Sequence, residues 1–370
     1  MAKTVFILGA GASKEAGAPL MAEFLDVVHS LKTLPEMQEI KADIDRVFDA
    51  ITKLRDTHYK SYIDLDNIEE IFGAFEMARI IKRLGTYTTD EIEALGHSLN
   101  RMIVKTLEEC IKLPLRDRQV RPPIAYEDFT KLIQNISSSF PRQDCSILTF
   151  NYDVGLDYAL YFFNIPIDYC LLESNKSQKV KFLKLHGSIN WGRCECGAIV
   201  PWYLSDFFKK RHFDTIGLDI LPPHLKPQHS SLTIGTNIQQ HKHCDQKAIS
   251  IYPVLVPPTW NKTEHHGELF RVWSQAAIEL AGAENIFIIG YSMPESDLFF
   301  RYLFALGTAG ETRLQRLWIF NPDLNGDVKQ RADKIKGRGI ERRYKFINQP
   351  FSEAIKLISN EADFRRERNV

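Results

Sequence analysis

The chain has 370 residues, of which 44% are hydrophobic and 25% are charged. This balance is that of a globular protein with enough apolar surface for a sizeable core, and it excludes a chain that is mainly disordered. The 47 Lys and Arg residues equal the Asp and Glu residues in number, so the formal net charge is zero. Proteins dedicated to nucleic-acid binding draw most of their affinity from excess Lys and Arg, so direct nucleic-acid binding is not expected.

Cysteine content and hydropathy indicate the compartment. The six cysteines are irregularly spaced and too few to form a disulfide scaffold in a chain of this length, which favours a reducing environment. The apolar run at residues 5–8 is too short for a signal peptide, and no later segment approaches the roughly 20 apolar residues that a membrane span requires. We therefore expect a soluble, cytoplasmic protein without a membrane partner.

The first element predicted is a buried strand over residues 3–8, rich in β-branched residues. Gly-Ala-Gly-Ala-Ser follows it at 9–13, which predicts a tight turn into a helix. From about residue 21 to 136, stretches such as 65–84 and 91–111 repeat apolar residues at helical spacing and lack strand-like runs. This part is predicted to be a mostly helical insertion.

Strand-like runs then return, and helical segments at 268–281 and 295–306 separate some of them. The runs lie at 145–150, 181–186, 253–256, 285–290 and 317–321. Continuous apolar strands between helices predict an α/β fold, a Rossmann-like parallel sheet covered on both faces, with an inserted helical module. The predicted units are the sheet domain at 1–30 and 140–350, the helical module at 31–139, a small irregular excursion at 192–250, and a C-terminal helix or tail at 351–370.

Polar residues follow several predicted strands, at the end where open α/β sheets bind ligands. They include the Gly-x-Gly turn, Asn151 with Asp153, and His186. Small residues in such a turn let backbone N–H groups approach a pyrophosphate, and histidine exchanges protons near neutral pH. Tight turns, Asx turns and helix caps explain the same residues without a ligand. The chain has no Walker A sequence, so nothing indicates a P-loop nucleoside triphosphatase.

Six motifs occur in order along the chain. They are Gly-Ala-Gly-Ala-Ser-Lys-Glu-Ala-Gly-Ala-Pro at 9–19, Thr-Phe-Asn-Tyr-Asp at 149–153, Leu-His-Gly-Ser-Ile-Asn-Trp at 185–191, Val-Pro-Pro-Thr-Trp-Asn-Lys at 256–262, Gly-Tyr-Ser at 290–292 and Asn-Pro-Asp at 321–323. As a set they resemble the sirtuin superfamily, more closely its prokaryotic sirtuin-like branch than the protein deacylases. The resemblance implies a Rossmann-type sirtuin domain that binds NAD, with a smaller helical module over the cleft.

The resemblance also implies a role for each matching residue. Gly9, Ala10, Gly11 and Ser13 would hold the pyrophosphate, Gly290 and Ser292 would contact phosphate or ribose, and Asn321 would contact the adenosine ribose. Asn151 would orient the nicotinamide ribose and a water, Asp153 would bind the carboxamide, and His186 would act as general base on a ribose hydroxyl or on water.

The chain departs from the deacylases at several positions. Phe150 stands where deacylases have Gln, and Ala-Pro-Leu-Met at 18–21 replaces Ile-Pro-Asp-Phe-Arg. The paired Cys-x-x-Cys zinc ribbon is not recognisable. Cys194, Cys196 and Cys244 can supply four zinc ligands together with His241 or His243, but Cys-x-Cys is a short spacing and the two pairs are about 45 residues apart. The spacing favours a reduced, non-ligating set, and no metal is assigned.

The resemblance implies an NAD+ hydrolase that produces nicotinamide and ADP-ribose, with NAD as its substrate. Proteins of this branch commonly deplete NAD as effectors of bacterial antiviral defence. We expect a homo-oligomer that depends on a separate defence partner, a HerA-type hexameric ATPase in the first place and a short Argonaute in the second. Two alternatives remain open: an NAD-dependent protein deacylase, and a non-catalytic module that senses NAD or ADP-ribose.

Overall fold

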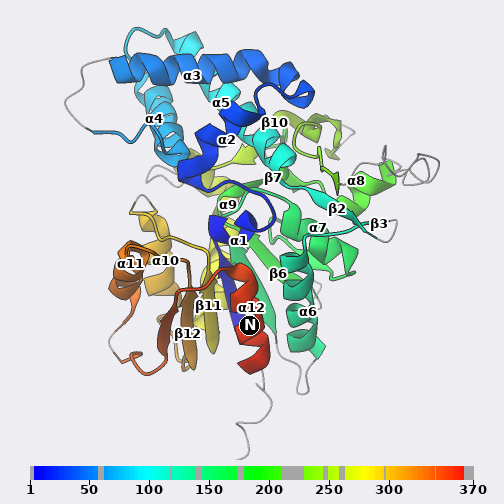
Figure 1. Ribbon diagram of the computed structural model, residues 1–370, viewed down its shortest axis with the longest axis vertical. Coiled ribbons are helices and arrows are strands. Elements are labelled where there is room, and N and C mark those ends of the chain that lie inside the picture. The colour runs from blue at the N-terminus through cyan, green and yellow to red at the C-terminus, as the bar shows by residue number, and fades with distance from the viewer. Residues whose placement is uncertain are drawn as a thin grey trace, which may run out of the picture.

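A seven-stranded parallel sheet forms the centre of the lower half of the molecule (Figure 1). The computed structural model describes residues 4–56, 62–116, 119–138, 144–172, 179–210, 229–244, 249–257, 263–295, 297–337 and 339–361. The strand order is β13-β12-β11-β1-β4-β6-β5. The bounds are β1 Thr4–Leu8, β4 Cys145–Thr149, β5 Ile167–Asp168, β6 Val180–Lys184, β11 Asn285–Ile289, β12 Arg316–Phe320 and β13 Tyr344–Ile347. The predicted α/β fold with a parallel sheet is confirmed.

The central strand β1 sets the register of the site. Leu8 lies level with Ile289 of β11 on one side and with Thr149 of β4 on the other, and Thr149 is level with Lys184 of β6. All residues of β1, β4 and β11 are buried. Because these parallel strands end in one row, the segments that follow them begin together at one edge of the sheet.

Helices cover both faces of this sheet. Phe6 of β1 contacts Phe129 of α6 (Ile124–Ser138), with ring centroids 5.0 Å apart, and α6 also packs against α12 (Phe351–Glu361). Ser146 of β4 is in register with Val5, so it faces the opposite side, where its hydroxyl donates to Glu279 of α9 (Thr263–Ala281) at 2.7 Å. Strand residues thus alternate between two helical layers. The remaining helices of this domain are α1 Ala10–Lys14, α7 Gly155–Phe162, α10 Leu298–Gly307 and α11 Asp327–Ile335.

A helical module lies above the sheet domain in Figure 1. It comprises η1 Met21–Glu23, α2 Phe24–Leu31, η2 Pro35–Ile40, α3 Lys41–Asp56, α4 Ile68–Ile81 and α5 Thr89–Cys110, and α5 packs against α3 and α4. The start of α5 is a capping box: the Thr88 hydroxyl accepts the N–H of Glu91 while the Glu91 carboxylate accepts the N–H of Thr88. Such local signals explain why this stretch is recognisably helical from its sequence.

The stretch from 111 to 139 differs from the helical module predicted there. Two short strands, β2 (Leu113–Arg116) and β3 (Gln119–Val120), follow α5, and β2 pairs with β9 (His229–Ser230). The next helix, α6, packs on the sheet domain, against α12, α7 and β4. Helical periodicity is the same whether the apolar face meets a helix or a sheet, so the pattern did not distinguish the two partners.

A second sheet, with strand order β10-β7-β8, is antiparallel. It consists of β10 (Ile249–Leu255), β7 (Gly187–Cys194) and β8 (Ile199–Pro201). The run at 253–256 was predicted to belong to the parallel sheet, and this prediction is wrong, because the run lies in the antiparallel sheet. A short apolar run fits either kind of sheet. The excursion at 192–250 is also more regular than expected, because β8, α8 (Leu204–Lys210), β9 and η5 (Ile238–Gln240) lie within it. Residues 211–228 and 245–248 of it lie outside the described residues.

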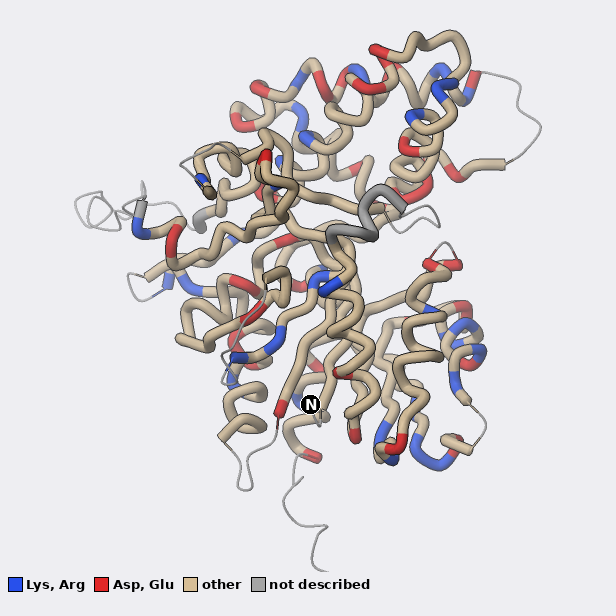
Figure 2. The backbone as a smooth tube through the Cα atoms, turned by 180° about the vertical axis from the view of Figure 1, so that it is seen from behind, with Lys and Arg blue, Asp and Glu red and all other residues tan. Residues whose placement is uncertain are grey.

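Charged residues of both signs are interspersed along the helices of the module (Figure 2). Within the described part of the chain, no helix is both long and apolar enough to cross a membrane. At the C-terminus, α12 ends at Glu361, and residues 362–370 of the predicted helix or tail lie outside the described residues.

Candidate functional site

The first group of site residues, here called the Ser13 cluster, consists of Ser13, Tyr126, Asn151 and Asp153. The Ser13 hydroxyl donates to Asp153 Oδ2 at 2.7 Å and accepts hydrogen bonds from Asn151 Nδ2 at 2.7 Å and from the Tyr126 hydroxyl at 2.8 Å. Asn151 Nδ2 also donates to the carbonyl of Gly9 at 2.9 Å. Asn151 and Asp153, two residues apart, therefore both direct their side chains to Ser13. Tyr126 was not predicted, because it comes from α6, far away in the sequence.

Asp153 is buried, and the buried ammonium group of Lys184 lies next to its main chain. Burial raises the pKa of the Asp153 carboxyl above its ordinary value, and the Lys184 ammonium opposes this rise. Lys184 is fully buried, and its Nζ donates to the carbonyl of Asp153 at 2.6 Å and to Asp157 Oδ2 at 3.1 Å. The carboxylate oxygens of Asp153 accept the Ser13 hydroxyl and the N–H of Gly155, so the side chain is held in one orientation. Neither Lys184 nor Asp157 was predicted.

The second group, here called the His186 cluster, consists of Phe150, His186, Tyr291 and Asp297. His186 Nε2 lies 3.5 Å from Asp297 Oδ2, which also accepts the Tyr291 hydroxyl at 2.7 Å. The Phe150 ring stacks on Tyr291 at a centroid distance of 4.3 Å and presents an edge contact to His186 at 5.0 Å. In the sequence, Asp297 is recognisable only as a helix N-cap residue before the apolar run of α10.

Main-chain hydrogen bonds hold the two clusters side by side. Leu185 N–H donates to the carbonyl of Thr149 at 2.8 Å, and Ile189 N–H donates to that of Tyr152 at 3.0 Å. The link between β6 and β7, which carries His186, therefore runs along residues 149–153. Since these residues alternate in direction, Asn151 and Asp153 join the Ser13 cluster while Phe150 joins the His186 cluster. The two clusters form one site at the carboxyl edge of the sheet.

The glycine turn makes a close backbone contact. Gly11 N–H donates to the carbonyl of Gly290 at 2.8 Å, and Gly9 N–H donates to that of Ile289 at 3.1 Å. Gly290 has φ +66°, and a Cβ on it would lie 2.4 Å from the nitrogen of Ala12. The glycines thus permit contact between two backbones, and these two amides have protein partners in place of the predicted phosphate. Ala10, between Gly9 and Gly11, is the first residue of α1.

Ser292 and Asn321 lie farther along the same edge. The carbonyl of exposed Ser292 accepts Arg331 Nε at 2.9 Å, and the Asn321 N–H donates to the carbonyl of Ile347 at 3.2 Å. Neither residue is a member of the Ser13 or His186 cluster as defined above. A cavity of about 350 Å³ lies beside the His186 cluster; its lining includes Tyr291, Asp297, Arg301 and Arg331. In the motif at 256–262, residues 258–262 lie outside the described residues.

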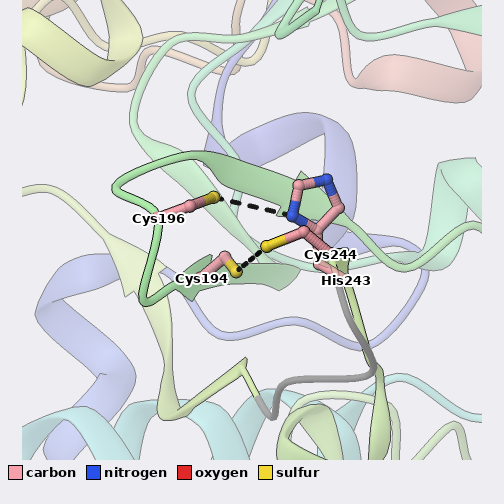
Figure 3. A group of neighbouring side chains, drawn as sticks. All are labelled: Cys194, Cys196, His243 and Cys244. Atoms are coloured by element: carbon pink, nitrogen blue, oxygen red, sulfur yellow. Dashed lines mark hydrogen bonds between the residues drawn. The ribbon is translucent and has the colours of Figure 1, made fainter.

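The cysteine–histidine cluster consists of Cys194, Cys196, His243 and Cys244, which face one another in Figure 3. Cys194 Sγ is 3.6 Å from Cys244 Sγ, Cys196 Sγ is 3.7 Å from His243 Nδ1, and all four ligand atoms lie within 4.8 Å of one another. Zn–S bonds of about 2.3 Å in a tetrahedron place sulfur ligands about 3.8 Å apart. This donor set therefore fits a structural zinc ion.

The thiols of the cluster influence one another, and only one of the two candidate histidines lies among them. The N–H of Ala198 is the main group that lowers the pKa of the Cys196 thiol to about 7, whereas the bond to Cys194 raises that of Cys244 to about 11. Crowded thiols resist joint ionisation unless a cation neutralises them. His241 stacks on Trp202 at 5.4 Å and is not in the cluster, so the structure selects His243 of the two candidates. The short Cys-x-Cys spacing does not prevent the four ligand atoms from coming together, contrary to our interpretation of the sequence.

Comparisons with known proteins give similarity at the level of solved structures. No family model matches the chain, and the comparison with curated proteins gives no match. A mutant Sir2 homologue in complex with ADP-ribose has a TM-score of 0.44 and 11% identity, with coverage of 100% of this chain and 95% of that chain. Sir2Tm bound to a propionylated peptide has a TM-score of 0.37 and 12% identity, with coverage of 97% of this chain and 93% of that chain. A Sir2–p53 peptide–NAD+ structure has a TM-score of 0.36 and 14% identity, with coverage of 98% of this chain and 93% of that chain.

Proposed function

We propose that this protein is an NAD+ hydrolase that cleaves NAD+ with water into nicotinamide and ADP-ribose. The observation that carries the proposal is the position of the Ser13 and His186 clusters on the two sides of residues 149–153, at the edge where open α/β sheets bind ligands. Apart from half-buried Asn151, their polar groups are buried, and hydrogen bonds within the protein hold them. Such preorganised groups stabilise the charge that develops in a transition state.

The reaction breaks the bond between the ribose C1′ and the nicotinamide nitrogen, and the electron pair leaves with nicotinamide. The oxygen of water bonds to C1′, and its proton passes to His186 and then to solvent. The donation of Asn151 Nδ2 to Ser13 and Gly9 orients the amide so that Oδ1 is the acceptor for a ribose hydroxyl or the water. Asp153 would receive the carboxamide of nicotinamide beside Ser13.

The test is release of nicotinamide and ADP-ribose from NAD+ by the purified protein, followed by chromatography. Loss of a general base costs about 10²–10⁴-fold, so His186→Ala is expected to lose at least about 100-fold in rate. Asn151→Ala is expected to lose activity as well, because the ribose and water lose their orienting group. The control is His97→Ala, whose ring stacks on Tyr252 in the contact between α5 and β10. Full activity in both site variants would overturn the assignment.

Two further arms of this assay separate the alternatives. If nicotinamide appears only when an acyl-lysine peptide is present, the protein is a deacylase. If calorimetry shows tight NAD+ binding but no product forms even with the protein's partner present, the site is a sensing module. Product from NAD+ and water alone supports the hydrolase.

We also propose that the hydrolase acts in the cytoplasm as the effector of a bacterial antiviral defence system, as a homo-oligomer controlled by a separate partner. The motif resemblance favours a HerA-type ATPase, with a short Argonaute second. The zero net charge supports an arrangement in which the partner contacts the nucleic acid and this chain acts on NAD+. Exposed apolar side chains on α9 and α10, namely Phe270, Tyr302 and Leu306, support a protein contact there.

Co-expression with the product of the neighbouring gene tests the partner. We expect the two proteins to copurify as a large assembly and the NAD+ hydrolysis rate to depend on the partner. Full activity of a monomer, unchanged by any neighbouring gene product, would contradict this part of the proposal.

A further inference from the structure

Asp297 lies directly opposite the imidazole that the proposed reaction uses. Its Oδ2 is 3.5 Å from His186 Nε2, and the side chains of Asp297 and His186 are 0% and 5% exposed. Charge interactions are stronger in such buried surroundings than at the surface. Hydrogen bonds around a catalytic group are often long without substrate and shorten when it binds.

Groups other than His186 hold the carboxylate in place. The Tyr291 hydroxyl donates to Oδ2 at 2.7 Å, and the N–H of Phe300 in the first turn of α10 donates to Oδ1 at 3.3 Å. The Phe150 ring contacts both Tyr291 and His186. The carboxylate and the imidazole are therefore fixed relative to each other by a packed aromatic ring and two hydrogen bonds.

We propose that Asp297, held by Tyr291, is the positioning residue of His186. The inference rests on the proposed function, in which His186 takes a proton. An Nε2–H directed at Asp297 leaves Nδ1 as the basic nitrogen of the neutral ring. When Nδ1 takes a proton from water or a ribose hydroxyl, the carboxylate of Asp297 stabilises the resulting imidazolium.

The competing explanation is that Asp297 only caps α10. Asn caps helices about as well as Asp and has nearly the same shape. Asp297→Asn therefore keeps the cap and removes the charge. Tyr291→Phe keeps the stacked ring and removes the hydroxyl that holds the carboxylate. These two variants separate positioning from capping.

The control variant for Asp297→Asn is chosen from the other titratable groups near His186. Tyr152 has its ring 6.4 Å from that of His186, and burial raises the pKa of Tyr152 and of Tyr291 well above the ordinary tyrosine value, so both stay neutral where histidine titrates. Among the described residues, Glu69 of α4 is the other acid whose charge acts on both tyrosines. Glu69→Gln therefore removes a second nearby negative charge while the Asp297 carboxylate stays in place.

The experiment measures kcat and KM for NAD+ between pH 5 and pH 9, together with melting temperatures. For Asp297→Asn we expect kcat to fall by about 10-fold or more with little change in KM. The acid limb of the profile should move to lower pH, because loss of the carboxylate makes the protonated ring less favourable. Tyr291→Phe should move it in the same direction by less.

Several outcomes would overturn the proposal. One is a wild-type kcat and pH profile in Asp297→Asn. Another is a fall in kcat with an unmoved profile and a lower melting temperature, which would show that the substitution acts by loosening the packing of α10 and not through the imidazole. A shift as large in Glu69→Gln would show a general field effect in place of positioning.

A second measurement does not depend on turnover. The histidine ring signals are followed by NMR against pH, and those of His186 are assigned from their loss in His186→Gln. We expect the protonation midpoint of His186 to lie lower in Asp297→Asn than in the wild type. Equal midpoints overturn the positioning role, whereas absence of NAD+ hydrolysis by the wild type overturns the proposed function, so the two failures are distinguishable.

Discussion

The hydroxyl of Ser13 donates a 2.7 Å hydrogen bond to Asp153, although 140 positions separate the two residues in the chain. The same oxygen accepts from Tyr126 and Asn151, so one small side chain connects α1, α6 and the end of β4. This contact keeps a buried carboxylate in a fixed orientation at the site.

Ser13→Ala is predicted to destabilise the protein, because it removes a donor from Asp153 and an acceptor from Tyr126 inside the core. An unsatisfied buried polar group costs about 1–3 kcal/mol. Urea unfolding measures the change. The control is Ser30→Ala in α2, whose exposed hydroxyl donates to the carbonyl of Asp26, and it should alter stability by less than about 0.5 kcal/mol. Equal effects of the two substitutions would contradict the prediction.

Lys184→Met is predicted to be among the most destabilising substitutions in the sheet. Lys184 and Asp157 are 0% and 1% exposed, and removal of one member of a buried ion pair typically costs about 3–5 kcal/mol. Lys131→Met breaks the exposed pair of Lys131 with Asp128 and should cost less than about 1 kcal/mol. Denaturant titration compares the two. A Lys184→Met protein as stable as Lys131→Met would show that the buried charge contributes nothing.

The cysteine–histidine cluster is predicted to bind about one zinc ion per chain, as measured by elemental analysis after dialysis. His243→Ala should lose the metal, because it removes one of four ligands, while His241→Ala should keep it. Chelation should lower the melting temperature of the wild type, since the ion would connect β7 to residues 243–244. Equal zinc contents in the two histidine variants would exclude this coordination.

Glu108 is predicted to make stability depend on pH. Burial raises its pKa from an ordinary 4.5 to about 7, although Thr236 and Gly235 donate hydrogen bonds to it. Between these values the folded state binds a proton that the unfolded chain has lost. The contribution is therefore complete below pH 4.5 and is lost as the pH rises to about 7.

Glu108→Gln should flatten the free energy of unfolding between pH 4.5 and pH 7, because an amide of the same shape does not titrate. Urea titrations at several pH values measure this slope. Glu93→Gln, on the exposed side of the same helix, should leave the slope as in the wild type. Parallel curves for the wild type and Glu108→Gln would refute the raised pKa.

Several elements were predictable from local sequence. The strand β1, its glycine turn and α1 follow from an apolar β-branched run that ends in small residues. The shared orientation of Asn151 and Asp153 follows from the alternation of side chains along an extended chain. Positions at strand ends also indicated His186 as a site residue, because parallel strands bring their carboxyl ends to one edge.

Other parts of the site were not predictable in this way. Tyr126 lies in the first turn of α6, in a stretch assigned to the helical module, and no local pattern connects it to Ser13. Asp297 has the sequence signature of a helix cap, which is also correct, and its contact with His186 depends on how α10 docks beside β11. The choice of His243 over His241 depends on the conformation of residues 241–244, which directly follow η5.

The sequence by itself determined the parallel α/β fold, the glycine turn and the strand ends that carry Asn151, Asp153 and His186, because these depend on hydrophobic periodicity and turn chemistry over a few residues. Only the tertiary structure decided that β10 pairs with β7, that α6 joins the sheet domain, and that Asp297 faces His186. The physical reason is that hydrogen-bond partners and metal ligands come from segments far apart in the chain. Their approach depends on how the whole core packs, which no local pattern encodes.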